Sequence, residues 1–278
     1  RLARVTRNGK IGLAAKSGNA VTMAFGADVA DLDAHIAAGT LAEAGAKAAA
    51  GEAVDEATLN FLPPITKPSK IICLGLNYRD HAEESGLGIP EFPVLFARFP
   101  SSLTGHGAPV ILPKVSSQLD WEAELVVVLS KGGKNIGEAD ALNHVAGYSV
   151  FNDASIRDYQ LRTPQWTAGK NFDDTGAFGP YLVTPEELPA GAAGLKIECR
   201  VNGQIMQSSN TGNLIFTVAN TIHLLSTFMT LEAGDMLVMG TPGGVGVARD
   251  PQVWMKAGDV CEVEIEGVGL LSNPIVAE

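Results

Sequence analysis

The clearest alternation of polar and apolar positions in the chain begins at Asp120. In residues 120–129, DWEAELVVVL, every second position of the first half is acidic, namely Asp120, Glu122 and Glu124. Successive side chains of a β-strand point to opposite faces, so this pattern predicts a strand with three acids on one face. The second half is a continuous aliphatic run, which is typical of a strand buried on both faces.

Two interpretations of the acidic face are open. Three carboxylates on one face repel one another unless a cation lies among them. A hard divalent cation such as Mg²⁺ binds oxygen ligands of this kind and keeps other positions for water or substrate. The alternative is a solvated edge of a sheet, because charged side chains usually remain exposed.

The chain before this strand predicts a separate small module. Residues 1–25 have the pattern of short strands joined by Gly and Asn turns, and the Ala-rich residues 28–60 favour one or two helices. Residues 62–68, LPPITKP, cannot be helical because three prolines fix φ and remove hydrogen-bond donors. We therefore expect a small N-terminal module, residues 1–66, and a main domain, residues 67–278.

Candidate chemistry begins early in the main domain. His81 and Glu84 are three residues apart in a predicted helical turn and would share one face. A carboxylate beside an imidazole orients the ring and raises its basicity, which suits a general base, although an ordinary surface pair has the same spacing. Asp153 ends a predicted strand just before a helix, where an acid either ligates a metal or caps the helix.

Several cationic and polar residues complete the candidate site. Arg157 and Gln160 lie four and seven residues after Asp153, so a helix would place all three on one side. Lys170 is the single lysine of a polar loop and would stabilise charge beside a metal and a bound anion. Arg98 follows a short apolar strand and either faces a carboxylate or lies on the surface.

The last third of the chain predicts mostly strands. Asn202-Gly203 between two alternating runs indicates a hairpin, and residues 214–225 have helical spacing. Residues 240–246, GTPGGVG, are followed by no Lys-Ser/Thr and lack the spacing of the dinucleotide fingerprint. They favour a tight loop that brings backbone N–H groups to a ligand.

Composition narrows the class of protein. The net charge of −11 argues against a nucleic-acid partner, and no apolar run has the length of a membrane span. The three cysteines are far apart and lie in apolar contexts, so we expect buried free thiols. Free thiols suit a reducing compartment, and we expect a cytoplasmic protein without a membrane partner.

Taken in series, the motifs resemble the fumarylacetoacetate hydrolase family over roughly residues 70–278. The motifs that carry the resemblance are Asn77-Tyr78 with His81-Ala82, residues 120–125, Gly147-Tyr148 with Asn152-Asp153, Gln165-Trp166 with Gly169-Lys170, Asn202-Gly203 and residues 240–246. The resemblance implies a mixed α+β, β-rich fold with a β-roll core after the small N-terminal α/β module. It also implies a homodimer.

The resemblance assigns roles to the candidate residues. It implies Mg²⁺ or Mn²⁺ held by Glu122, Glu124 and Asp153. It implies that His81 and Glu84 form the water-activating pair. The residues that it places along the substrate are Arg157, Gln160, Thr241 and the catalytic Lys170. We also assign Arg98 to substrate binding, where many members have lysine, while Met239 stands where many have threonine.

The implied activity is hydrolysis of a carbon–carbon bond in a 2,4-diketo acid, such as an acylpyruvate or fumarylpyruvate, to a pyruvate-type product and a carboxylic acid. His81 would take a proton from water, and Lys170 would stabilise the developing negative charge. Two alternatives stay open. One is decarboxylation of oxaloacetate, or a keto–enol or 2-hydroxy-dienoate isomerisation, in the same metal site. The other is a non-catalytic ligand-binding protein that keeps the fold.

Overall fold

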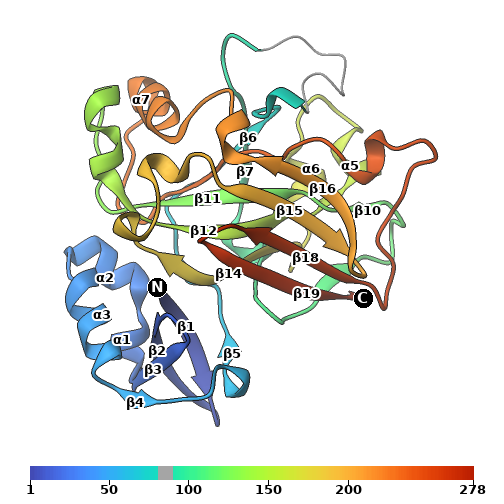
Figure 1. The fold of residues 1–278 in the computed structure, drawn as a ribbon. Helices are drawn as coiled ribbons and strands as arrows, with labels where there is room; N and C mark the ends of the chain where they lie inside the picture. The colour runs from blue at the N-terminus through green and yellow to red at the C-terminus, as the bar shows by residue number, and fades with distance from the viewer. Residues whose placement is uncertain (81–89) are drawn as a thin grey trace.

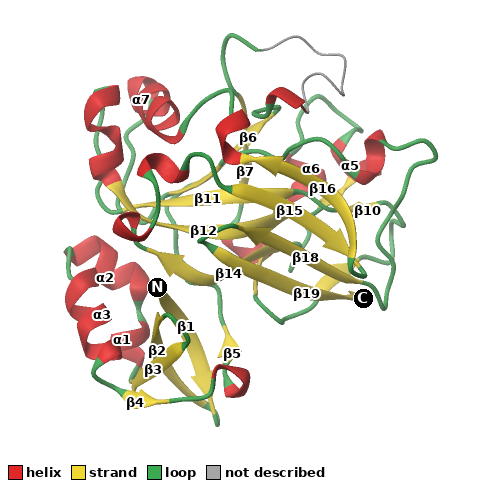
Figure 2. Ribbon diagram, viewed as in Figure 1, coloured by secondary structure: helices red, strands yellow, loops and turns green. Residues whose placement is uncertain are grey.

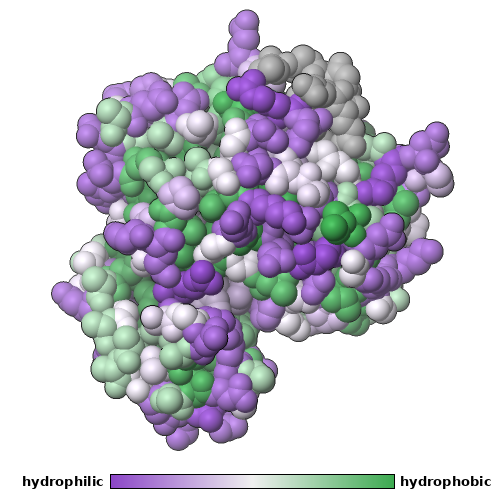
Figure 3. Space-filling view, viewed as in Figure 1, coloured by the Kyte–Doolittle hydropathy of each residue, from purple (hydrophilic) through white to green (hydrophobic). Residues whose placement is uncertain are grey.

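The structure is a computed structural model that describes residues 1–80 and 90–278. It is mixed α+β and β-rich, as predicted, with a small α/β part beside a larger body of strands (Figures 1 and 2). Figure 3 shows hydrophilic side chains over both parts, with smaller apolar areas between them. No helix in the described ranges is long and apolar enough to cross a bilayer.

The N-terminal part follows the predicted order of strands and then helices. Its strands are β1 (Leu2–Arg7), β2 (Lys10–Ser17), β3 (Ala20–Phe25), β4 (Glu52–Ala53) and β5 (Asn60–Phe61). Its helices are α1 (Ala27–Ala30), α2 (Leu32–Ala38) and α3 (Leu41–Ala49). Gly39 ends α2 in the left-handed conformation, at φ 70°, which glycine adopts without steric cost.

One sheet continues from this part into the body. Its order is β4-β3-β2-β1-β14-β12-β11-β17-β6-β7, and β1 meets β14 (Gly176–Val183) at Leu2 opposite Leu182. The predicted boundary near residue 66 lies in the irregular segment between β5 and β6. The carboxylate of Asp33 in α2 accepts the amides of Thr66 at 3.0 Å and Lys67 at 2.9 Å, and so holds this segment in place.

The centre of the body is three strands that are buried along their whole length. They are β11 (Ala123–Leu129), β12 (Val145–Asp153) and β14. The sheet is completed by β6 (Ile71–Gly75), β7 (Val94–Arg98), β8 (Leu103–Gly105) and β17 (Met236–Val238). The aliphatic run that the sequence places after Glu124 is therefore buried on both faces, as expected for a central strand.

A second sheet packs against β11, β12 and β14 (Figure 1). Its order is β16 (Gln204–Asn210), β15 (Lys196–Val201), β18 (Val260–Ile265), β19 (Gly269–Ala277) and β9 (Val110–Leu112). The predicted hairpin is confirmed, because Asn202 and Gly203 join β15 to β16 with φ of 51° and 77°. Cys73, Cys199 and Cys261 are buried free thiols, also as predicted.

Four short elements surround the end of β11 and β12 at Ala123 and Asp153. They are β10 (Leu119–Asp120), β13 (Ser155–Ile156), α5 (Arg157–Gln160) and α6 (Thr167–Lys170). Helix α7 (Val218–Phe228) lies at the other end of these strands, against residues 135–144 (Figure 1). The predicted helix over residues 214–225 begins only at Val218, because the Thr217 side chain caps it. Glu138–His144 form a 3₁₀ helix, with Ala141 as its one buried side chain.

A hydrophobic cluster crosses the boundary between the two parts. Leu2, Leu13 and Ile36 of the N-terminal part belong to the same buried cluster as Val126 and Leu182 of the body. Burial of apolar surface contributes about 25 cal/mol per Å², so this shared cluster stabilises the contact between the parts.

We expect Val127→Ala to lower the free energy of unfolding by about 2 kcal/mol, because it removes two methyl groups from a closely packed site. Val127 is 0% exposed in the middle of β11. The matched control is Val115→Ala at a position that is 60% exposed, where the change should stay within about 0.5 kcal/mol. Urea unfolding measures both, and equal losses would contradict the central position of β11.

Candidate metal centre

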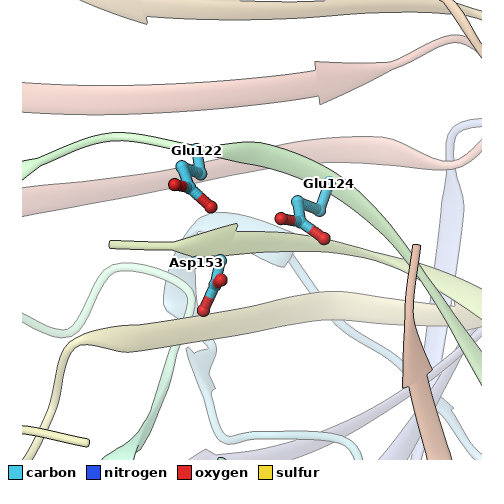
Figure 4. A group of neighbouring side chains, drawn as sticks. All are labelled: Glu122, Glu124 and Asp153. Atoms are coloured by element: carbon cyan, nitrogen blue, oxygen red, sulfur yellow. The ribbon is translucent and has the colours of Figure 1, made fainter. Parts of the chain in front are cut away.

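The three predicted metal ligands come together where β11 meets β12 (Figure 4). Glu122 immediately precedes β11, Glu124 lies in it, and Asp153 ends β12. One oxygen from each carboxylate lies within 4.8 Å of the others, and all three side chains are buried. The described residues thus offer a hard cation three oxygen ligands in one place.

The strand predicted over residues 120–129 is interrupted at Trp121 and Glu122. At this point side-chain carboxamides accept the backbone hydrogen bonds that a neighbouring strand would otherwise accept. The amide of Glu122 donates to Asn152 Oδ1 at 3.1 Å, and the amide of Ala123 donates to Gln207 Oε1 at 2.9 Å. The peptide groups before and after Glu122 are therefore paired although the ladder is broken, and the acid can turn into the site.

Backbone pairing sets Asp153 beside Glu122. The amide of Asp153 donates to the carbonyl of Glu122 at 2.9 Å, while Ala123 lies opposite Asn152 in the β11–β12 ladder. Asp153 is thus fixed by strand register. Its carboxylate lies in the acidic cluster and α5 has no side-chain cap, so Asp153 is not a helix cap, while metal ligation stays a prediction.

Two cationic side chains hold the Asp153 carboxylate. Lys170 ends α6, and its Nζ lies 2.6 Å from Asp153 Oδ2 and 2.7 Å from Glu122 Oε2. Arg98, at the end of β7, donates from Nε to Asp153 Oδ1 and from Nη2 to the carbonyl of Ala154 at 2.5 Å. Arg98 is buried behind Asp153 against a carboxylate, so its predicted contact with substrate remains a prediction.

Three residues hold two of the three guanidinium nitrogens of Arg157. Its Nε donates to Asp120 Oδ2 at 2.8 Å, and its Nη1 lies 2.7 Å from both Glu122 Oε1 and Gln160 Oε1. Within the described residues its Nη2 is buried without a hydrogen-bond partner. An unpaired guanidinium nitrogen is costly to bury, so this atom points to an acceptor supplied by a ligand.

The glycine-rich loop directs its N–H groups at carboxylates of the protein. Gly240, in a conformation with φ of 91°, donates to Glu124 Oε2 at 2.5 Å. Gly246 and Val247 donate to the two oxygens of Asp120 at 2.7 and 2.9 Å. The loop was predicted to bring such groups to a ligand. Instead these three stabilise buried acids beside the cavity.

Charge is not balanced in this cluster. Four buried carboxylates face three cationic side chains, which leaves one formal negative charge in excess: Asp120, Glu122, Glu124 and Asp153 against Arg98, Arg157 and Lys170. Glu124 is the carboxylate that has no salt bridge to any residue in the described ranges. A divalent cation would reverse the sign of the excess and remove the repulsion at Glu124.

The pKa values of the two glutamates diverge for this reason. Burial raises the pKa of Glu124 well above its usual value, and the nearby charges of Asp153 and Glu122 raise it further. Burial also acts to raise the pKa of Glu122, but Lys170 and Arg157 outweigh burial and lower it to about 2. Without a cation, Glu124 therefore takes up a proton more readily than Glu122 does.

A cavity of about 170 Å³ opens onto the acids. Four residues that the sequence assigned to the substrate line it, namely Arg157, Gln160, Lys170 and Thr241. Glu122 and Glu124 form part of the same wall, and Phe96 and Trp166 form an apolar side. The volume lies below the roughly 300–1,000 Å³ typical of sites for drug-sized ligands, so the cavity suits a small polar molecule.

Some site residues were not predicted, and two predicted ones are not described. His81 and Glu84 lie outside the described residues, so their role as the base pair stays a prediction. The roles of Asn152 and Gln207 were missed. Asn152 had a signal, since it precedes Asp153 in a motif, whereas Gln207 is one of several polar residues in a predicted strand and nothing in the sequence marks it out.

Comparisons with known proteins cover nearly the whole main domain. Residues 70–276 match the family model described as fumarylacetoacetate (FAA) hydrolase C-terminal. The chain is 45% identical over 225 residues to the mitochondrial oxaloacetate tautomerase of Xenopus laevis, a match that covers 80% of this chain and 70% of that protein.

Solved structures extend the likeness to the N-terminal part. The fumarylacetoacetate hydrolase of Exiguobacterium antarcticum has a TM-score of 0.88 and 31% identity, over 100% of this chain and 99% of that one. The 5-carboxymethyl-2-hydroxymuconate delta-isomerase of Mycobacterium smegmatis has a TM-score of 0.80 and 29% identity, also over 100% and 99%.

We expect Mn²⁺ binding to release a proton from Glu124 at pH values above its usual pKa of 4.5 and below its raised pKa. The apparent affinity for Mn²⁺ therefore rises with pH through this window. In the metal-free protein the raised pKa makes stability fall over the same window, since the unfolded chain releases this proton first. Calorimetric titration in two buffers of different ionisation enthalpy measures the release.

Glu124→Gln is the control for this experiment. It keeps the shape of the side chain but carries no titratable proton, so Mn²⁺ should bind more weakly and without proton release from this position. A binding enthalpy that is the same in both buffers throughout the window would contradict the assignment of the proton to Glu124.

Proposed function

The chain belongs to the fumarylacetoacetate hydrolase family and is an enzyme of that family, and from this premise we propose that it interconverts the keto and enol forms of a small 2-oxo dicarboxylic acid of the oxaloacetate type, with Mg²⁺ or Mn²⁺. The observation that carries the proposal is the small cavity lined by Glu122, Glu124 and Arg157, together with the buried Nη2 of Arg157, which has no hydrogen-bond partner among the described residues.

The residues present fit a divalent cation. Glu122, Glu124 and Asp153 would hold it, since they offer only carboxylate oxygens, lie close together and carry the uncompensated negative charge. When bound, the cation would supply Lewis-acid polarisation of a 2-oxo group. Such donor chemistry favours Mg²⁺ or Mn²⁺ over softer metals.

Arg157 provides a fixed site for a substrate carboxylate. Asp120, Glu122 and Gln160 hold its other two nitrogens, so the guanidinium is orientated before substrate arrives. A carboxylate at Nη2 would form a charge-assisted hydrogen bond and satisfy the one donor left unpaired. This arrangement favours a dicarboxylic acid in which one end chelates the metal and the carboxylate at the other end binds Arg157.

Lys170 is placed to stabilise negative charge on the reacting oxygen. An ammonium group has three N–H donors, and two are directed at Glu122 and Asp153. The only other acceptor in the described ranges is the carbonyl of Asp153 at 3.5 Å, a long contact that an oxygen of a ligand in the cavity lined by Lys170 would replace. When a proton leaves the carbon beside the 2-oxo group, charge develops on the oxygen, and a donor already in position stabilises it without reorganisation.

We prefer tautomerisation to hydrolysis, the reaction that the sequence favoured, and two observations support this choice. The Xenopus laevis relative is named for oxaloacetate tautomerisation, and the cavity is small for a substrate with a long acyl group. Hydrolysis of a 2,4-diketo acid is the second candidate, supported by the likeness to the hydrolase of Exiguobacterium antarcticum. Hydrolysis needs an activated water, whereas tautomerisation needs only proton transfer.

The proposed partner is thus a small 2-oxo acid, in a homodimer as the family resemblance implies. The cytoplasmic location stays a prediction from the free thiols, while the Xenopus laevis relative is mitochondrial.

We expect the protein with Mn²⁺ or Mg²⁺ to accelerate the conversion of enol-oxaloacetate to its keto form, followed by the loss of ultraviolet absorbance of the enol. Exhaustive chelation should return the rate to that of protein-free buffer containing the same chelator, because Lys170 and Arg157 without the cation lack the polarising group. Full activity after chelation would refute the metal-dependent proposal.

We expect His81→Ala to separate the two candidate reactions. Cleavage of acylpyruvate, fumarylpyruvate and sugar-derived diketo acids should fall by at least about 100-fold if His81 activates water, while tautomerisation keeps most of its rate. Product analysis over this panel plus oxaloacetate measures both. Undiminished cleavage in the variant would refute the assigned base, and binding without turnover would favour a non-catalytic protein.

A further inference from the structure

Gln207 is turned into the site by an irregularity in β16. In the β15–β16 ladder Cys199 lies opposite Gln207 but Arg200 lies opposite Ile205, so Met206 is an extra residue on β16. Ile205 is 54% exposed, whereas Gln207 is 1% exposed. A β-bulge is a common means of redirecting a side chain next to an active site, and here it directs a carboxamide inward.

The hydrogen bonds of Gln207 define the orientation of its amide. Oε1 accepts from the amide of Ala123 at 2.9 Å, so this atom is the oxygen. Nε2 donates to the carbonyl of Pro242 at 2.8 Å and to Thr241 Oγ1 at 2.8 Å. A backbone amide can only donate and a carbonyl can only accept, so the two partners agree on which atom is nitrogen.

This orientation restricts the hydroxyl of Thr241. Both hydrogens of Gln207 Nε2 are used, one on Pro242 and one on Thr241, and Nε2 has no lone pair to offer. Thr241 Oγ1 must therefore accept from Gln207, and its own proton is turned away from Gln207. Thr241 lines the same cavity as Glu122 and Lys170. Its hydroxyl proton can therefore point to an oxygen of an acid bound in that cavity.

We propose that Gln207 is a positioning residue that sets Thr241 as a hydrogen-bond donor to the bound acid and also anchors the peptide between Glu122 and Glu124. The inference rests on the proposed function. It assigns two separable tasks to one carboxamide. Nε2 orients the Thr241 hydroxyl on the substrate side of the cavity, and Oε1 holds the amide of Ala123 on the metal side.

Gln207→Glu separates the two tasks. An oxygen remains for the amide of Ala123, so the metal side keeps its anchor. The atom that replaces Nε2 carries at most one hydrogen, and the carbonyl of Pro242 requires it. In either protonation state Thr241 then donates its proton to this carboxyl, and the donor is withdrawn from the cavity.

The experiment measures binding of oxalate, an inert compact dianion that resembles the chelating end of a 2-oxo acid, to the Mn²⁺-loaded protein by calorimetry. We expect Gln207→Glu to weaken oxalate about tenfold, the worth of one hydrogen bond, and to leave the affinity for Mn²⁺ within about twofold. Thr241→Val should weaken oxalate by a similar factor.

The double variant distinguishes positioning from simple charge repulsion. If Gln207 acts through the Thr241 hydroxyl, Gln207→Glu combined with Thr241→Val should bind oxalate about as well as Thr241→Val alone. Repulsion by an added carboxylate, or a general loosening of the fold, would persist in the Thr241→Val background. Effects that multiply would therefore overturn the proposal.

Two further variants complete the test. Gln207→Met also removes the acceptor for Ala123, so Mn²⁺ affinity should fall together with oxalate affinity. Gln204→Glu, at the exposed start of the same strand, is the matched control and should bind both as the unmodified protein does. Oxalate that binds Gln207→Glu unchanged would refute the positioning role alone, whereas an unmodified protein that binds no oxalate with Mn²⁺ would remove the proposed function as well.

Discussion

Burying more carboxylate charge than the chain can neutralise is the constraint that organises this structure. Each buried acid needs donors or cations, because an ion transferred from water into the interior loses most of its solvation. Among the described residues, Asp120 and Asp153 receive guanidinium groups, Glu122 receives two cationic partners, and Glu124 receives a single backbone N–H. The fold thereby leaves one acid poorly compensated, and that acid faces the cavity.

The same constraint accounts for the irregular backbone around the acids. A regular strand would pair Glu122 and Ala123 with a neighbouring strand and leave little freedom for the side chains to converge. The ladder instead breaks, and Asn152 and Gln207 supply the hydrogen bonds that a strand would have made. The backbone hydrogen bonds lost where the ladder breaks are thus replaced by side-chain hydrogen bonds, and the acids are held in their inward orientation.

Patterns within a short stretch of sequence predicted much of the fold. The buried strand β11, the hairpin at Asn202-Gly203 and the strands before the N-terminal helices all follow from periodicity and turn chemistry. The convergence of Asp153 with Glu122 and Glu124 depends on strand register between segments some thirty residues apart, and it became an expectation only through resemblance to a family. The role of Gln207 depends on a bulge, which no local pattern of β16 reveals.

The hydrophobic cluster shared by the N-terminal part and the body has a consequence for how the chain unfolds. Leu2 and Leu13 share a buried cluster with Val126 and Leu182, which belong to the strands that carry or adjoin the acidic cluster. The proline-rich segment divides the chain in sequence, but the apolar contacts across it make the two parts energetically dependent. The chain should therefore lose its structure as one cooperative unit, with the acidic centre surviving only as long as the N-terminal strands stay docked.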